Sequence, residues 1–340
     1  MLPLPIFDYH RPRTLAEALG LLASLGPRAQ IIAGGTDVLP NMKQGLFEPE
    51  HVVSISRLEE LRGISLDPGH DGGYPQTPGA SSLIIGAGMK LAEIADSLLV
   101  RRLAPALAEA AGAVGGPHHR AMGTLGGNIC LDTRCRYYNQ TYFWRKALGY
   151  CLKKDGTVCH VVKGGAKCVA AASNDSAPAL IALDAEIRIL GPAGERRLPA
   201  RDFYTADGIK NTVLEPGEIV VRVAVPVVPG RRSAFEKLRK RGAIDFPLLS
   251  VAARFDTDGD RRLTAADVVV SALGARPRRV RAATKVSVGT ATERLAETLA
   301  QAAFAECKPL TNLDDEAEWR REMVPVVVEK AVRRALGAAL

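Results

Sequence analysis

Two short Gly-Gly turns, each beside a threonine, constrain the fold of this chain more than any other feature of its sequence. The first, Gly34-Gly35-Thr36, follows an apolar run, and the second lies within Thr124-Leu125-Gly126-Gly127-Asn128. Glycine lets the backbone adopt positive φ and approach a ligand closely, and successive amides in such a turn can bind phosphate oxygens. A single Gly-Gly turn is more often only a turn, but two of them can hold the two ends of a long anionic molecule. Neither turn has the Gly-x-Gly-x-x-Gly pattern, so a Rossmann dinucleotide fold is not indicated.

The length and composition indicate a globular protein of two or three domains. The chain has 340 residues, of which 47% are hydrophobic and 24% charged, and it contains no apolar run that would span a membrane. The first residues lack the pattern of a signal peptide, so we expect a cytoplasmic protein. The net charge of +8 suits nucleic acid, an anionic cofactor or an acidic partner. Because no nucleic-acid-binding module is present, we expect neither nucleic-acid binding nor membrane attachment.

Hydrophobic periodicity divides the chain into a larger α/β unit, residues 1–226, and a smaller α+β domain, residues 232–340. Thr14 followed by Glu17 resembles a capping box and predicts the start of a helix. We expect strands at residues 30–33, 51–55, 83–85, 185–190, 219–225, 234–238, 249–255 and 265–271. We expect helices at residues 15–25, 91–97, 105–113, 292–306 and 314–338. Residues 67–80 read as a hairpin loop, and residues 115–128 as irregular structure.

Four of the six cysteines are close together in the sequence, namely Cys135, Cys151, Cys159 and Cys168. Disulfides are unlikely in a cytoplasmic chain, so four thiolates point to a tetrahedral zinc site or an iron–sulfur cluster. Structural zinc sites generally use closely spaced cysteine pairs, which are missing here. The wide spacing therefore favours a four-iron cluster over zinc. The plainer alternative is a basic surface hairpin with buried free thiols. Cys130 and Cys307 are expected to be packed in the core.

The residues around these cysteines favour the cluster. Aromatic residues that would form a dry shell around it are Tyr137, Tyr138, Tyr142, Phe143, Trp144 and Tyr150. Basic residues that would balance its negative charge are Arg136, Arg145, Lys146, Lys153, Lys154, Lys163 and Lys167, against one acid, Asp155.

Several motifs, in order along nearly the whole chain, resemble the flavoprotein subunits of the xanthine dehydrogenase and carbon monoxide dehydrogenase family. They are Ala33 to Asp37, Thr124 to Asn128, Asp175 to Asp184, Phe235 to Leu238 and Asp245 to Pro247. The resemblance implies an α+β fold, in which a two-part FAD-binding α/β domain of the PCMH type precedes a small C-terminal domain with an antiparallel sheet and helices. It also implies bound FAD.

The resemblance assigns FAD contacts residue by residue. The first turn would hold the pyrophosphate, and the second would follow the rest of the cofactor, with an aspartate and a lysine also touching FAD. The positions that match are Ile32, Ala33, Gly34, Gly35, Thr36, Asp37, Val38, Thr124, Gly127, Asn128, Asp175 and Lys237. Without the resemblance, Lys237 would be read as a surface lysine and Asp175 as a cap or turn residue.

The segment at about 131–171 interrupts the family pattern and resembles an insertion in the β subunits of 4-hydroxybenzoyl-CoA reductases. That resemblance implies a [4Fe-4S] cluster held by Cys135, Cys151, Cys159 and Cys168. It also implies a heterotrimer, itself dimerised, with a molybdenum-cofactor subunit and a [2Fe-2S] subunit. The substrate reaction, reductive dehydroxylation to benzoyl-CoA, would take place on the molybdenum subunit, so we expect no catalytic residue in this chain.

Ferredoxin would donate the electrons, and the basic residues Arg145, Lys146, Lys153, Lys154 and Lys163 would form its docking rim. Two alternatives stay open. The chain could be the FAD subunit of another molybdenum hydroxylase that oxidises an aldehyde, a purine or another heterocycle. It could instead be a zinc-stapled binding protein on a degenerate flavin fold.

Overall fold

The computed structural model describes residues 2–67, 81–260, 262–286, 294–313 and 316–337. The first part is a small α/β layer in which β1 (Asp8–His10), β3 (His51–Ser54) and β2 (Ala29–Ile32) form a parallel sheet in that order. Helix α1 (Leu15–Leu25) begins as predicted, because the Thr14 hydroxyl accepts a hydrogen bond from the Glu17 amide at 3.1 Å. The short 3₁₀ turn Gly26–Arg28 follows α1, and α2 (Val38–Lys43) follows β2.

The second part is a five-stranded antiparallel sheet in the order β4-β5-β8-β6-β7. Its strands are β4 (Ile64–Asp67), β5 (Ser82–Gly86), β6 (Glu186–Gly191), β7 (Gly194–Pro199) and β8 (Ile219–Pro226). Its helices are α3 (Leu91–Asp96), α4 (Leu98–Leu103), α5 (Pro105–Ala113), α6 (Pro117–Met122), α7 (Leu125–Ile129) and α9 (Ser176–Ala182), with 3₁₀ turns at Glu59–Leu61 and Ala200–Asp202. The predicted hairpin loop falls largely on residues 68–80, outside the described residues.

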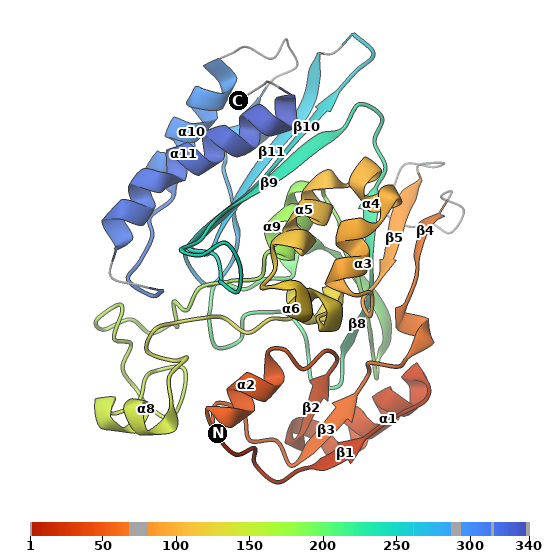
Figure 1. Cartoon of the computed structure of the whole chain (residues 1–340), viewed down its shortest axis with the longest axis vertical. Coiled ribbons are helices and arrows are strands. Elements are labelled where there is room, and N and C mark those ends of the chain that lie inside the picture. Colours follow the sequence, from red (N-terminus) through yellow and green to blue (C-terminus); the bar gives the residue numbers. More distant parts are fainter. Residues whose placement is uncertain (1, 68–80, 261, 287–293, 314–315, 338–340) are drawn as a thin grey trace.

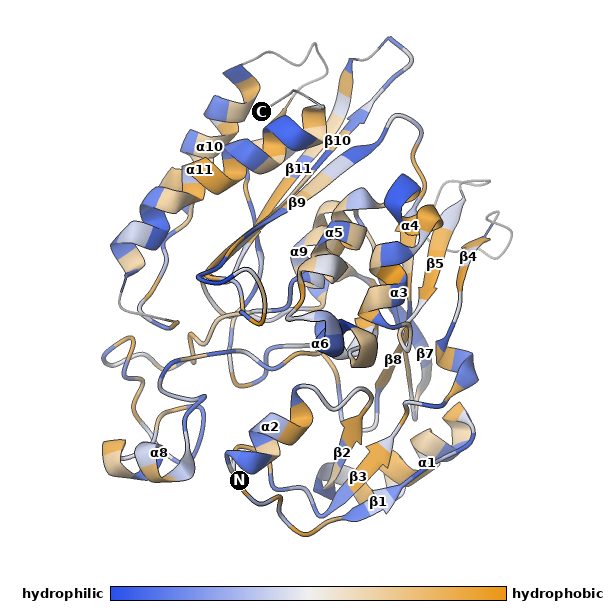
Figure 2. Cartoon of the chain, in the orientation of Figure 1, coloured by the Kyte–Doolittle hydropathy of each residue, from blue (hydrophilic) through white to orange (hydrophobic). Residues whose placement is uncertain are grey.

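The C-terminal part is an antiparallel sheet in the order β12-β11-β10-β9, covered by two helices. Its elements are β9 (Arg232–Leu238), β10 (Leu249–Thr257), β11 (Leu263–Ser271), β12 (Arg278–Arg279), the 3₁₀ turn Ala283–Lys285, α10 (Arg294–Glu306) and α11 (Ala317–Leu336). Nearly every residue of β10 is buried, because one face of the sheet packs on α10 and α11 and the other on α5 and α9. Helices α10 and α11 lie over one face of this sheet (Figure 1), and buried hydrophobic residues come from both the strands and the helices (Figure 2).

The cysteine-rich segment is a separate excursion that carries helix α8 (Tyr142–Leu148) (Figure 1). Backbone hydrogen bonds in both directions between Arg134 and Ala171, at 2.8 and 2.7 Å, close its base. The fully buried Arg145 side chain anchors it to the first part, because it donates to the backbone carbonyls of Gln44 and Gly45, both at 2.9 Å. Asn312 ties it to the C-terminal part through a 2.7 Å hydrogen bond to the Val169 carbonyl.

The predicted fold class is confirmed: a two-part larger unit is followed by a small antiparallel sheet with helices. One local expectation is wrong, because residues 115–128 contain the short helices α6 and α7 rather than irregular structure. Each helix is too short for its hydrophobic residues to show a repeat. Among the described helices, none has the length and apolar character that a bilayer crossing requires.

Candidate cofactor sites

The first Gly-Gly turn joins β2 to α2 and lies directly on the second glycine-rich stretch. Gly35 has φ 73°, a region that favours glycine. A Cβ on Gly34 would lie 2.1 Å from the carbonyl oxygen of Met122, so the backbones touch. Within the described part of the chain, the amides of Gly34, Gly35 and Thr36 donate no hydrogen bond. These amides are therefore available to oxygen atoms of a ligand.

In the second glycine-rich stretch, the backbone amides of both glycines already have hydrogen-bond partners within the protein. The Thr124 hydroxyl caps α7 by accepting from the Gly127 amide at 3.1 Å. The Gly126 amide donates to the Ala87 carbonyl at 2.8 Å, and a Cβ on Gly126 would lie 2.9 Å from the Ala87 side chain. Gly126 thus allows α7 to approach the end of β5 closely. The glycines of this stretch are therefore needed for helix packing as well as for the approach of a ligand. The two glycine-rich stretches lie side by side, since Gly34 approaches Met122 and a Cβ on Gly123 would lie 3.6 Å from the Thr36 hydroxyl.

Asp37 turns away from the glycine turn and toward the cysteine-rich segment. Its carboxylate forms an ion pair with Arg134 and accepts from the Asn41 side chain at 3.1 Å. Burial raises the pKa of Asp37, and the Arg134 guanidinium opposes this shift. Asp37 therefore connects the turn to the segment at 131–171.

Asn128, Asp175 and Lys237 converge from three distant parts of the sequence. The Asn128 side chain accepts from the Ser176 amide at 3.0 Å. The Lys237 ammonium lies 2.6 Å from an Asp175 oxygen and also donates to the Ala113 carbonyl at 3.0 Å. Both charged side chains are 3% exposed, so the reading of Lys237 as a surface lysine does not apply. Burial raises the pKa of Asp175 to about 6, against the opposing charge of Lys237.

Apolar side chains that the sequence did not single out are exposed beside these turns. Met122 is 52% exposed, Ile244 59% and Phe246 47%. Ile244 has φ 58°, a rare conformation for a β-branched residue, and its amide donates to the Gly115 carbonyl at 3.0 Å. Free amides beside exposed apolar side chains fit a ligand that combines anionic phosphates with a flat apolar ring. In the sequence, Phe246 belonged to one of the family motifs but was not predicted to contact a ligand. No sequence pattern indicated a role for Met122 or Ile244.

The four clustered cysteines converge on one small cavity. Cys135, Cys151, Cys159 and Cys168 all line it, together with Tyr137, Tyr138, Lys153 and His160, and its volume is about 20 Å³. All four side chains are buried. Amides of Val162 and Ala170 point at the sulfurs of Cys159 and Cys168, both at 3.4 Å. Burial raises the pKa of the Cys135 thiol to about 11, and nearby thiols add to the shift.

Among the described residues, no group of three or more His, Cys, Asp or Glu side chains is close enough to share one metal ion. A single zinc ion needs four ligand atoms within one short coordination shell. A four-iron cluster binds each cysteine through a different iron atom, so its sulfurs stand further apart. Four buried thiols therefore line one cavity, and the described residues contain no group with the spacing of a single-ion metal site.

Gly208 is a further residue at this site that the sequence did not reveal. A Cβ on Gly208 would lie 2.8 Å from the Cys168 sulfur, and its amide donates to the Cys168 carbonyl at 2.8 Å. It lies far along the chain from every cysteine, so no spacing pattern marks it. Glycine is required here because the loop packs directly against the sulfur.

Several expectations about the surroundings of the cysteines are wrong. The expected dry shell is incomplete, because Tyr142, Phe143 and Trp144 are 43%, 77% and 41% exposed. Helix α8 turns Arg145 inward to its carbonyl partners, so these aromatic side chains face outward. Arg145 and Lys153 are buried and do not belong to an exposed basic rim.

The two remaining cysteines differ from each other. Cys307 is fully buried in the C-terminal core, as predicted. Cys130, directly after α7, is exposed as a residue, unlike the expected core thiol, although burial raises the pKa of its sulfhydryl group to about 12.

Comparison with known proteins finds matches along the whole chain. The family described as FAD binding domain in molybdopterin dehydrogenase matches residues 5–228, and the CO dehydrogenase flavoprotein C-terminal domain matches residues 233–335. The carbon monoxide dehydrogenase medium chain of Afipia carboxidovorans is 31% identical over 98% of each chain. The aldehyde oxidoreductase FAD-binding subunit PaoB of Escherichia coli is 33% identical over 82% of this chain and 84% of its own. A solved structure of the carbon monoxide dehydrogenase from Hydrogenophaga pseudoflava gives a TM-score of 0.77 at 28% identity, covering 98% of this chain and 99% of the other.

Proposed function

The chain belongs to the FAD-binding medium subunits of the molybdenum hydroxylase family. We propose that it carries FAD and, on its four clustered cysteines, one [4Fe-4S] cluster, as the electron-transfer subunit of a 4-hydroxybenzoyl-CoA reductase. The observation that carries the finer part of this proposal is the convergence of Cys135, Cys151, Cys159 and Cys168 on one buried cavity. When bound, flavin exchanges one or two electrons and the cluster one at a time.

For FAD, we propose that residues 32–38 hold the pyrophosphate, with the free amides of Gly34, Gly35 and Thr36 as donors. Thr124, Gly127 and Asn128 would line the continuation of the same surface. Asp175 and Lys237 would act as a pair, because Lys237 is neutralised by Asp175 rather than presented as an isolated cation. The exposed side chains of Met122, Ile244 and Phe246 would cover apolar parts of the cofactor.

For the iron–sulfur cluster, the fit rests on the number, burial and arrangement of the thiols. The segment that holds them is fixed at both ends, by Arg145 on one side and Asn312 on the other. Rigid support of this kind keeps metal ligands in place when no cluster is bound. In the alternative of four free thiols in an ordinary hairpin, Cys135, Cys151 and Cys168 would pack only as small apolar side chains beside residues such as Tyr138 and Leu46.

The partners of the complex would be a molybdenum-cofactor subunit, where the substrate reaction takes place, and a [2Fe-2S] subunit. Removal of the para-hydroxyl group consumes two electrons and two protons and releases water and benzoyl-CoA. An acidic ferredoxin would deliver the electrons to the cysteine-rich segment. The exposed lysines Lys146, Lys163 and Lys167 would form its docking surface, in place of the rim predicted from the sequence.

The test is a substrate comparison with the anaerobically purified complex. We expect conversion of 4-hydroxybenzoyl-CoA to benzoyl-CoA when reduced ferredoxin is supplied. In parallel, an aldehyde and a purine are offered with an electron acceptor. Oxidation of either, without reduction of the thioester, would make the chain the FAD subunit of another molybdenum hydroxylase. Zinc without visible cluster absorbance in the purified chain would instead support the zinc-stapled alternative.

A further inference from the structure

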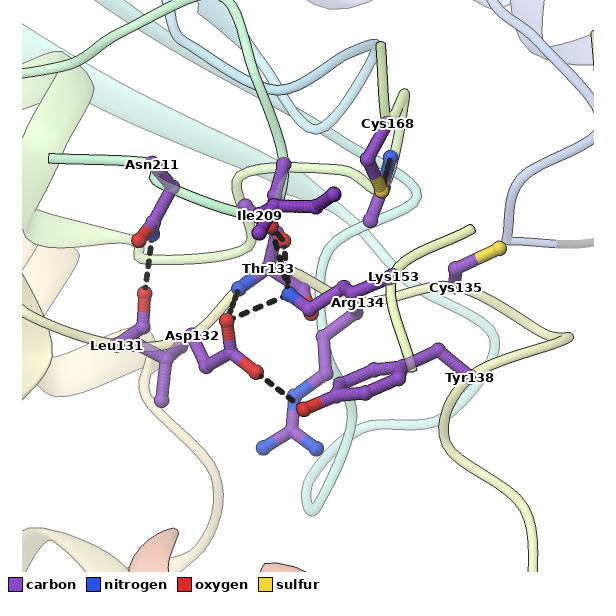
Figure 3. A network of polar contacts seen from close by, with 12 residues as sticks. Leu131, Asp132, Thr133, Arg134, Cys135, Tyr138, Lys153, Cys168, Ile209 and Asn211 are labelled. Atoms are coloured by element: carbon purple, nitrogen blue, oxygen red, sulfur yellow. Dashed lines mark hydrogen bonds and ion pairs between the residues drawn. The ribbon is translucent and has the colours of Figure 1, made fainter. Parts of the chain in front are cut away.

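One buried lysine connects the segments that carry the cysteines. Lys153 lies in the hairpin between Cys151 and Cys159, and its side chain is only 6% exposed. Its ammonium donates to an Asp132 carboxylate oxygen at 2.6 Å, the Thr133 hydroxyl at 2.5 Å and the Gly208 carbonyl at 2.8 Å (Figure 3). It also lies over the Tyr138 ring, 4.4 Å from the centroid.

Together these contacts reach the chain segments of all four cysteines. Asp132 and Thr133 lie three and two residues before Cys135 in the chain. Gly208 packs against the Cys168 sulfur and binds the Cys168 carbonyl. Lys153 is itself held between Cys151 and Cys159, so a single ammonium group joins the backbone segments of all four thiols. The Thr133 hydroxyl strengthens the junction, because it also donates to the Gly208 carbonyl at 2.7 Å.

The charges around Lys153 are asymmetric with respect to the cavity. Lys153 lines the cavity, and Asp132 is absent from its described lining. Asp132 lies on the outer side of Lys153, where it also accepts from the Tyr138 hydroxyl at 2.9 Å. The positive member of the ion pair, Lys153, is therefore closer to the cavity than the negative member, Asp132.

We propose that Lys153 is a positioning residue of the cluster site, and that its charge raises the reduction potential of the cluster while Asp132 lowers it. This inference rests on the proposed function, since it requires a [4Fe-4S] cluster on the four cysteines. A reduced cluster carries one more negative charge than an oxidised one, so a buried cation facing it favours reduction. Removing the aspartate strengthens the same field, because the ammonium loses its counter-charge.

The experiment is a redox titration of the cluster in the anaerobically purified complex, followed by electron paramagnetic resonance. In Lys153→Met, we expect the equilibrium constant for reduction to fall about tenfold, which is about 59 mV for one electron. In Asp132→Asn, we expect a shift of opposite sign. Lys154→Met is the matched control. Lys154 neighbours Lys153 but pairs with Asp155 at 3.3 Å and does not line the cavity, so the potential should not change.

Iron and sulfide contents separate the outcomes. If Lys153→Met loses its iron, Asp132→Asn and the charge-conserving Lys153→Arg carry the test, and Lys153→Arg should keep the wild-type potential. Potentials that shift in the same direction in the Lys153 and Asp132 variants, or not at all, would overturn the electrostatic role. A wild-type complex without a four-iron cluster would overturn the proposed function, and this inference with it.

Discussion

The buried ion pair between Asp175 and Lys237 gives the sharpest test of the flavin half of the molecule. The two groups lie 2.6 Å apart and come from different structural units, the start of α9 and strand β9. At an effective dielectric constant of about 20, their attraction is roughly 6 kcal/mol, and much of it offsets the cost of burying both charges. Removing either partner leaves one buried charge uncompensated, which costs about 3–5 kcal/mol.

The effect of pH distinguishes the two single variants. The pKa of Asp175 is about 6 in the folded chain, above its ordinary value of 3.8. The folded carboxylate therefore binds a proton more readily than the unfolded one, and this group's contribution to stability falls as the pH rises from about 4 to about 6. In Lys237→Met the deficit should be large at pH 8 and smaller at pH 5, because Asp175 becomes neutral. In Asp175→Asn the side chain is neutral at every pH, so the part of the pH dependence of stability that Asp175 contributes between about pH 4 and pH 6 should disappear.

Urea unfolding of the FAD-loaded chain, at pH 5 and pH 8, measures these differences. The double variant Asp175→Asn, Lys237→Met should lose clearly less free energy of unfolding than the sum of the single variants. Additive losses, or a Lys237→Met deficit that is the same at both pH values, would refute the account of this pair.

The remaining predictions concern flavin retention, the cysteine site and partner docking. Gly35→Val should lose FAD on gel filtration, because φ 73° strains a β-branched residue and its Cβ would crowd Leu39 and Ile32; retention of stoichiometric flavin would count against the turn. Gly208→Ala should lower the iron content, since the new methyl group would lie 2.8 Å from the Cys168 sulfur; full iron loading would show that the loop can move away. Reversing the exposed Lys146 and Lys163 to Glu should slow reduction by ferredoxin at low salt and leave reduction by a small neutral donor unchanged; equal slowing with both donors would place the defect at the cluster.

Much of the fold could be predicted from local patterns. The Thr14 cap set the start of α1, and the Val- and Ile-rich runs of β8 and β11 identified buried strands. Helices α6 and α7 were missed because each spans too few residues for periodicity. The packing that supports them, such as Gly126 on Ala87, is non-local.

The cysteine-rich segment shows where sequence patterns lose information. Composition indicated that aromatic and basic residues gather there, but it could not give their direction. Arg145 is buried because the carbonyls of Gln44 and Gly45, about a hundred residues away, accept hydrogen bonds from its guanidinium group. With Arg145 on the inner face of α8, Phe143 lies on the outer face and is exposed. Lys153 is buried for a similar reason, because its acceptors include the distant Gly208 carbonyl. A charge in the sequence therefore does not reveal whether it belongs to a docking surface or to an internal network.

The measurement that tests the central claim most directly is the iron and acid-labile sulfide content of the anaerobically purified chain and its cysteine variants. We predict four irons and four sulfides per wild-type chain. Serine at Cys135, Cys151, Cys159 or Cys168 should reduce that content, whereas Cys130→Ser and Cys307→Ser should retain it. One zinc per chain without sulfide, or full iron content in Cys151→Ser, would contradict the assignment of these four cysteines to an iron–sulfur cluster.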